Sequence, residues 1–242
     1  MAEVAPGRLL AVIPARGGSK RLPRKNVLPL AGRPLIQWSI DAALASGVFD
    51  AVLVSTDDEE IAAAARAAGA LVPWLRPADL ASDTATSAAV LQHALEWYEC
   101  ERGPAEAVVL LQPTSPFRRA GSIREAVAAY HVQNAVAPRA AVVSVSPAAQ
   151  HPAWCFRLGE GATMEPFQGW DALQRRSQDL PPAYALNGSI YVLPAPLVRG
   201  GGALLQPGTR AFVMADLHES LDIDTAEDWA QAQAQATHWE RG

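Results

Sequence analysis

The chain has 242 residues, of which half are hydrophobic and 19% are charged, and its formal net charge is −5. This length allows one large domain or one domain with an insert, and the acidic balance argues against a nucleic-acid partner. No apolar run approaches the roughly 18 residues of a membrane span, no signal peptide is visible, and two cysteines are too few for a disulfide framework, so we expect a cytoplasmic protein without a membrane partner.

The first predicted element is a buried strand over residues 9–13, which ends at Pro14. In the loop that follows, Gly17 and Gly18 let the backbone turn and bring its N–H groups close to a ligand. Residues 16–25 of this loop carry five cations, namely Arg16, Lys20, Arg21, Arg24 and Lys25. Such a concentration of positive charge in an acidic chain favours binding of a polyanion such as a chain of phosphates.

The cationic loop also has simpler interpretations. A solvated loop, a run like a nuclear-localisation signal or an RNA-binding patch would carry similar residues. Neither a P-loop nor the Gly-x-Gly-x-x-Gly pattern is present. The spacing of the loop alone therefore leaves these alternatives open.

Predicted strands and helices alternate along the next part of the chain. Amphipathic segments predict helices over residues 34–46, 58–68, 87–100 and 122–133, and short apolar runs predict strands over residues 51–55, 71–73, 107–111 and 141–145. This alternation indicates an α/β fold with a mostly parallel, doubly wound sheet, which binds ligands at the carboxyl ends of its strands. Polar residues follow strands at 16–26, 55–58 and 112–118, which predicts one shared site.

The alternation breaks between residues 147 and 182, where prolines and aromatic side chains such as Trp154 and Trp170 are scattered. We interpret this segment as a dimerisation insert, with a long packed loop as the alternative. Residues 1–146 and 183–242 then form the α/β domain. Strands resume at 188–193 and 209–214, and Thr225 with Asp228 predicts the cap of a last helix.

Asp222 and Asp224 are separated by one residue in a stretch predicted to be extended. Alternate side chains of an extended chain share a face, so both carboxylates can point at one cation. Hard oxygen ligands that leave room for phosphate oxygens suit Mg²⁺. A capping or hinge role is the default for such a pair, but beside a phosphate loop it predicts a magnesium site for a nucleoside triphosphate.

Together these motifs resemble the acylneuraminate cytidylyltransferases, the CMP-sialic acid synthetases. The matching segments are residues 15–20, 25–26, 55–57, 112–116, 187–191 and 222–225, which span nearly the whole chain. The resemblance implies a Rossmann-like fold of the nucleotide-diphospho-sugar transferase type and a homodimer built by the insert. It also implies transfer of CMP from CTP to the anomeric hydroxyl of a nonulosonic acid, a nine-carbon 2-keto acid sugar, with release of pyrophosphate.

The resemblance implies roles for individual residues as well. The nucleotide would be bound by Arg16, Gly17, Ser19, Lys20, Lys25, Asn26 and Ser87, and Mg²⁺ by Asp222 and Asp224. The acidic sugar would be bound by Gln112, Arg175, Arg176 and Asn187. Arg16, Lys20 and Asp222 are the predicted catalytic residues, and the general base could be Asp222 or a metal-bound water.

The acceptor stays open at this point. Trp154 stands where sialic acid members carry a lysine, and Ser177 replaces an arginine. Legionaminic acid, pseudaminic acid, a deaminated relative and a phosphonate are alternatives to N-acetylneuraminate, although residues 112–116 favour the sialic or legionaminic side. Two other hypotheses are a glycosyltransferase whose Asp222 and Asp224 hold a nucleotide-sugar, and a nucleotide-binding module without catalysis.

Overall fold

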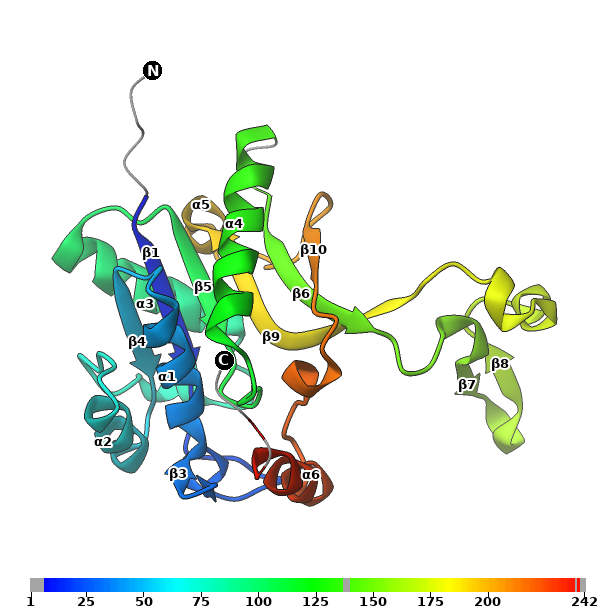
Figure 1. Ribbon diagram of the computed structural model, residues 1–242, viewed down its shortest axis with the longest axis horizontal. Coiled ribbons are helices and arrows are strands. Elements are labelled where there is room, and N and C mark those ends of the chain that lie inside the picture. The colour runs from blue at the N-terminus through cyan, green and yellow to red at the C-terminus, as the bar shows by residue number, and fades with distance from the viewer. Residues whose placement is uncertain (1–6, 137–139, 238, 240–242) are drawn as a thin grey trace.

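The computed structural model describes residues 7–136, 140–237 and 239. Its centre is a six-stranded sheet with the strand order β10-β6-β9-β5-β1-β4 (Figure 1). The strands are β1 (Leu9–Pro14), β4 (Ala51–Ser55), β5 (Ala107–Leu111), β6 (Val142–Pro147), β9 (Tyr184–Pro194) and β10 (Arg210–Val213). This mostly parallel sheet within an α/β fold confirms the predicted fold class.

Helices cover both faces of the sheet. The helices that pack on it are α1 (Leu35–Ser46), α2 (Glu59–Ala67), α3 (Ser87–Arg102), α4 (Ala120–Val136) and α5 (Ala195–Arg199), while α6 (Ala226–Ala236) packs against Leu30 and the start of α1. Successive side chains of a strand point to opposite faces, so Ile13 packs with α1, α2 and α4, whereas Val12 packs with α3 and α5. None of the described helices is long and apolar enough to cross a membrane.

β9 is the strand that departs from the predicted parallel pattern. It runs antiparallel to both β5 and β6, with Tyr191 opposite Leu110 and Val143. The other pairs of this sheet, β1 with β4, β1 with β5 and β6 with β10, are parallel. The composition of residues 188–193 predicts a strand correctly, but strand direction depends on the path of the preceding insert and has no local sequence signal.

Local sequence signals account well for the ends of several elements. Gly47 ends α1 with a left-handed φ of 67°. Thr225 and Asp228 form the predicted capping box at the start of α6. The prediction of a strand at residues 71–73 was wrong, since only Leu71 forms a bridge to β4. Pro73 has no N–H to donate and limits this strand.

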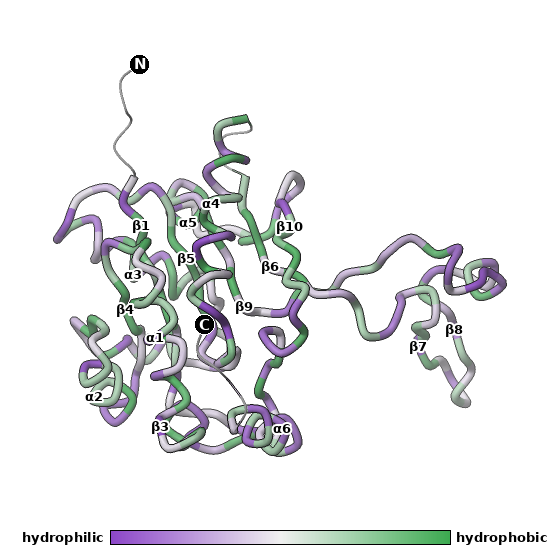
Figure 2. Tube along the Cα trace, in the orientation of Figure 1, coloured by the Kyte–Doolittle hydropathy of each residue, from purple (hydrophilic) through white to green (hydrophobic). Residues whose placement is uncertain are grey.

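Residues 148–183 leave the sheet between β6 and β9 and project away from it (Figure 1). Within this segment β7 (Phe156–Leu158) pairs with β8 (Met164–Pro166) in an antiparallel hairpin. Ala153 is the single buried residue of the segment. Figure 2 shows apolar residues along the strands of the central sheet and a mixed pattern in the projecting segment. The insert therefore has no core of its own.

Candidate active site

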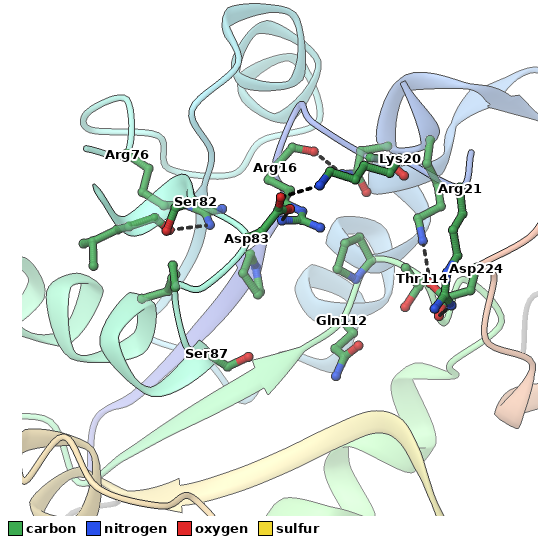
Figure 3. Close-up of a pocket in the computed structure, with 18 of the residues that line it drawn as sticks. Arg16, Lys20, Arg21, Arg76, Ser82, Asp83, Ser87, Gln112, Thr114 and Asp224 are labelled. Carbon is green, nitrogen blue, oxygen red and sulfur yellow. Dashed lines mark hydrogen bonds and ion pairs between the residues drawn. The ribbon is translucent and has the colours of Figure 1, made fainter. Parts of the chain in front are cut away.

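A cleft of about 570 Å³ opens at the carboxyl ends of β1 and β5 (Figure 3). This is the edge at which open α/β sheets bind ligands. The residues that line the cleft and were predicted for the site are Arg16, Ser19, Lys20, Lys25, Asn26, Ser87, Gln112 and Asp224. The fold therefore gathers segments that lie far apart in the sequence into one polar cleft.

Lys25 joins the cationic loop to the acidic pair. Arg24 adopts a left-handed φ of 57° and starts a 3₁₀ turn that buries Lys25 and Asn26. Lys25 Nζ donates to the Ile223 carbonyl at 2.6 Å and to the Asp224 carboxylate at 2.9 Å. These two segments, 199 residues apart in the sequence, thus meet in the cleft.

Arg16 and Lys20 lie on another side of the cleft and share one carboxylate. Arg16 Nη1 is 2.8 Å from Asp83 Oδ1, and Lys20 Nζ is 2.5 Å from Asp83 Oδ2. The hydrogen bond from Lys20, with that from Arg16, lowers the pKa of Asp83. Sequence reasoning missed Asp83, which stands in a polar run with no pattern of its own.

Asn26 fixes the backbone of the cationic loop. Its Nδ2 donates to the Arg16 carbonyl at 3.0 Å. Its Oδ1 is buried and accepts no hydrogen bond among the described residues. Buried polar atoms in proteins are almost always paired. The acceptor is therefore available to a donor that the cleft could admit.

Gly17 shapes the loop without lining the cleft. Its N–H donates to Asp57 Oδ1 at 3.0 Å, so this amide is already engaged inside the protein. A Cβ at Gly17 would lie 2.6 Å from Asp58 Oδ2 and 2.9 Å from Asp58 Cβ. Asp58 also caps α2 through the Glu60 and Ile61 amides. Gly17 is therefore required for close packing, and the expected free N–H group is absent at this residue.

Ser87 and Gln112 lie on the part of the cleft formed by α3 and β5 (Figure 3). Ser87 is the first residue of α3, whose cap Thr86 accepts a hydrogen bond from the Ala89 amide. Partial positive charge at this helix end favours an electronegative ligand group. Gln112 directly follows β5, and a Cβ at Gly188 would lie 3.5 Å from its amide group. Gly188, with a φ of 72°, thus brings β9 close to Gln112.

Arg118 holds the backbone beneath Gln112. It is buried, and its guanidinium donates to the Gln112 carbonyl at 2.8 Å, to the Ser189 carbonyl at 2.9 Å and to Ser39 Oγ at 3.2 Å. Burial lowers the pKa of Arg118 to about 9, which the Glu219 carboxylate opposes. The side chain therefore stays charged near neutral pH and ties β5, β9 and α1 together.

Asp222 lies next to the cleft and does not line it. Asp222 is exposed to solvent, yet neighbouring protein groups displace enough water around its carboxylate that desolvation raises its pKa. The nearby Asp224 carboxylate raises the pKa further. The Thr114 hydroxyl opposes this change. Two carboxylates that repel one another can be relieved by a shared cation.

The oxygen chemistry of the two carboxylates suits a divalent cation that also takes phosphate oxygens. Mg²⁺ is usually bound through one or two carboxylates together with phosphates of the substrate. Among the residues that the structure describes, no group of three or more His, Cys, Asp or Glu side chains could hold a metal by itself. Asp222 and Asp224 thus offer a partial ligand set that a nucleotide would complete.

Three predicted sugar ligands lie elsewhere. Asn187 is buried, where its amide bonds to Ser144 Oγ at 2.6 Å and to Ser146 Oγ at 2.9 Å. These bonds join β9 to β6, and Asn187 does not line the cleft. Arg175 and Arg176 lie in the insert, where they bond to Asp179. Neither arginine lines the cleft of its own chain.

Arg76 lines the cleft but was not predicted. It is buried and donates to the Ser55 carbonyl at 2.5 Å and to the Leu80 carbonyl at 3.4 Å. Burial lowers the pKa of Arg76. The Asp57 carboxylate opposes this change, and the Arg16 guanidinium lowers the pKa further. The only sequence signal was a cation three residues after the predicted strand at residues 71–73. The sequence around Arg76 has no motif, and only the fold shows that this side chain lines the cleft.

Residues 10–187 match the model of a protein family described as cytidylyltransferase. The chain is 42% identical over 226 residues to the CMP-N,N'-diacetyllegionaminic acid synthase of Legionella pneumophila, with 92% of this chain and 94% of that protein covered. It is 38% identical over 225 residues to the N-acylneuraminate cytidylyltransferase of Streptococcus agalactiae serotype III, with 91% of this chain and 51% of that protein covered.

One solved structure shows the same fold. It is a CMP:2-keto-3-deoxy-manno-octonic acid synthetase complexed with CTP, to which the chain is 19% identical at a TM-score of 0.72. The superposition covers 96% of this chain and 99% of that one. This likeness supports the architecture of the sheet and its insert.

Proposed function

Because the chain belongs to the cytidylyltransferase family, we propose that it transfers CMP from CTP to the anomeric hydroxyl of a nonulosonic acid and releases pyrophosphate. The observation that carries this proposal is the meeting of Lys25 with Asp224 at 2.9 Å. Through this contact the cationic loop and Asp224 line one cleft, with Asp222 next to it, as attack on a nucleoside triphosphate requires. The names of the curated relatives support an acidic sugar as the acceptor.

The proposal places the triphosphate against the loop after β1. Arg16, Lys20 and Lys25 supply positive charge there, and Ser19 supplies a hydroxyl donor. Asn26 and Ser87 hold the cytidine, since both line the cleft and offer polar groups to a base or a ribose. Gly17 then contributes by shaping the loop.

The reaction joins the acceptor oxygen to the α-phosphorus and breaks the bond to the bridging oxygen of the β-phosphate, and pyrophosphate departs. Arg16 and Lys20 stabilise the charge that develops on the leaving group. The proton of the acceptor hydroxyl passes to Asp222 or to water in the cleft as the new bond to phosphorus forms. Positioning of the two reactants supplies much of the remaining acceleration.

We propose Mg²⁺ as the cofactor, held by Asp222 and Asp224. When bound, the ion neutralises charge on the phosphate oxygens of the nucleotide. We also propose a cytoplasmic protein, because Cys100 and Cys155 are both free thiols.

The acceptor is proposed to lie beside Gln112, with its carboxylate bound by cations from a second subunit. Arg175 and Arg176 belong to the insert, which projects from the sheet (Figure 1), and neither lines the cleft of its own chain. Large apolar side chains are exposed on the same insert, among them Leu158, Phe167 and Trp170. A homodimer that covers these side chains would carry the two arginines toward the cleft of the partner subunit. Legionaminic acid is the first acceptor to test.

Pyrophosphate release tests the proposed function. The protein is incubated with CTP, MgCl₂ and, in turn, N,N'-diacetyllegionaminic, pseudaminic and N-acetylneuraminic acids. We expect acceptor-dependent release with at least one acid, abolition by Asp222→Ala and full activity of Asp79→Asn. No release with any acceptor would overturn the proposal. Thermal stabilisation by UDP-sugars in place of CTP would favour the glycosyltransferase hypothesis.

A further inference from the structure

Asp83 faces the two cations that the triphosphate would need. Each carboxylate oxygen accepts from a separate cation, Oδ1 from Arg16 Nη1 at 2.8 Å and Oδ2 from Lys20 Nζ at 2.5 Å. A phosphate group would present two oxygens to the same pair of donors. In the free protein the Asp83 carboxylate therefore makes the contacts that a nucleotide phosphate is expected to make.

The segment that presents Asp83 is fixed at both ends. On one side Ser82 Oγ donates to the Asp79 carbonyl at 3.1 Å. On the other side Thr86 Oγ1 accepts from the Ala89 amide at 3.2 Å and begins α3. The carboxylate is thus held near the cations by a short tether, at a high effective concentration.

The Asp83 contacts differ in burial from those of Lys25. The side chains of Arg16, Lys20 and Asp83 are 40%, 76% and 53% exposed, whereas that of Lys25 is 9% exposed. Exposed ion pairs are weak and are screened by salt. A triphosphate carries several negative charges against the single charge of Asp83. It can therefore displace Asp83 while the contact of the buried Lys25 with Asp224, whose side chain is 49% exposed, persists.

We propose that Asp83 is a displaceable counter-anion of the phosphate site. It pairs with Arg16 and Lys20 in the free enzyme, yields them to the triphosphate, and pairs with them again as pyrophosphate leaves. This inference rests on the proposed function, because it assigns a competitor to the same site. Its consequence is selectivity, since a ligand with one negative charge gains too little to displace the carboxylate, and pyrophosphate is released more readily.

Asp83→Asn tests this role, because it keeps the shape of the side chain and removes its charge. Asp79→Asn is the matched control, because it makes the same change in net charge. Asp79 lies four residues from Asp83 and forms no ion pair among the described residues. Calorimetry measures binding of inorganic tripolyphosphate, pyrophosphate and CTP at fixed MgCl₂ and low salt. We expect Asp83→Asn to bind tripolyphosphate roughly three- to tenfold more tightly than Asp79→Asn does, as the loss of two exposed pairs allows.

The two proposals fail in distinguishable ways. Equal or weaker binding of tripolyphosphate by Asp83→Asn than by Asp79→Asn overturns the counter-anion role, and weaker binding would make Asp83 a ligand of the phosphates or of their cation. Binding of tripolyphosphate without any binding of CTP would overturn the proposed function and with it the role of Asp83 in the catalytic cycle, while tighter binding by Asp83→Asn would still support competition of Asp83 with phosphate groups. A difference between the variants that disappears at high salt supports the exposed ion pairs as its source.

Discussion

Lys25 and Lys20 belong to one cationic loop but differ in burial, and this difference predicts different consequences of their removal. Lys25→Met leaves the Ile223 carbonyl without its 2.6 Å donor, which should lower the free energy of unfolding by about 1–3 kcal/mol and weaken CTP binding. Lys20→Met removes only an exposed pair, so stability should change by less than about 0.5 kcal/mol while CTP binding still weakens.

Urea denaturation and calorimetry of the two lysine variants separate these effects. A Lys25→Met protein as stable as the wild type would show that the contact with Ile223 is not part of the fold. Unchanged CTP binding by Lys20→Met would remove this lysine from the proposed phosphate site.

Asp222 should make stability depend on pH. Its pKa is raised in the folded protein above the value in the unfolded chain, so the ionised carboxylate opposes folding at neutral pH. Protonation relieves this cost as the pH falls through the folded pKa. Asp222→Asn should therefore unfold at a higher temperature than the wild type at pH 7 without divalent ions. The gain in the free energy of unfolding should be less than about 1 kcal/mol, because the side chain is exposed.

The gain in Asp222→Asn should shrink at a pH below the folded pKa, where the wild-type carboxyl is also neutral. Thermal unfolding at pH 7 and at acidic pH measures both differences. A variant that is less stable than the wild type at pH 7 would contradict the raised pKa. Pyrophosphate release by the same variant should be strongly reduced, since a stabilising change at a reactive carboxylate usually costs activity.

The sequence predicted some residues of the cleft and missed others. The cations after β1 were found because positive charge is concentrated there in an acidic chain, and Asp224 was found from its spacing to Asp222. Asp83 and Arg76 were not found, because each reaches the cleft through the path of residues 72–86, which follows no period. Asn187 lies in a recognisable motif, yet its amide is engaged by Ser144 and Ser146 inside the protein.

Arg118 shows how one side chain coordinates several elements. It bonds to the residue after β5, to β9 and to α1, and the acceptors of these bonds are neutral carbonyl and hydroxyl oxygens. Arg118→Met leaves these acceptors without their donor, so the free energy of unfolding should fall by about 2–4 kcal/mol. Arg118→Lys should recover less than half of the loss, because one amine cannot reproduce the geometry of the guanidinium.

Kinetics of the Arg118 variants test whether these bonds also position Gln112. The KM for the acidic acceptor should rise in Arg118→Lys while the KM for CTP stays close to the wild-type value, since the cationic loop does not contact Arg118. An equal rise of both KM values would indicate a general loss of structure. Urea denaturation of Arg118→Met gives the stability change independently.

At the scale of elements, local signals fixed most of the helices and left the sheet order open. Caps such as Thr225 with Asp228 act within a few residues and are readable in a single sequence. The place of β9 between β5 and β6 depends on a chain that leaves the sheet and returns in the opposite direction. Arg118 and Gly188 stabilise that return, but their contacts join segments dozens of residues apart.

At the scale of the whole molecule, the projecting insert has a surface that suits a second copy of the chain. Phe167 and Trp170 are 56% and 62% exposed, and a segment with one buried residue gains little stability from its own packing. Broken periodicity marked this segment in the sequence, but its projection away from the sheet could not be derived from composition.

Replacement of Phe167 and Trp170 by serine should convert the proposed dimer into a monomer. The central sheet does not depend on these side chains, so the unfolding temperature of the isolated subunit should change little. Sedimentation equilibrium gives the mass of the assembly, and Asp171→Asn, a polar change on the same segment, serves as the control. A wild-type protein that is monomeric at micromolar concentration would contradict the dimer directly.

The same serine variant tests whether the subunits complete each other's acceptor site. If Arg175 and Arg176 reach the partner's cleft, the monomeric variant should bind CTP like the wild type but show a raised KM for the acidic acceptor. Arg175→Gln combined with Arg176→Gln should raise that KM without changing the mass of the assembly. A monomer with unchanged acceptor kinetics would confine the two arginines to the insert, where Asp179 already binds both of them.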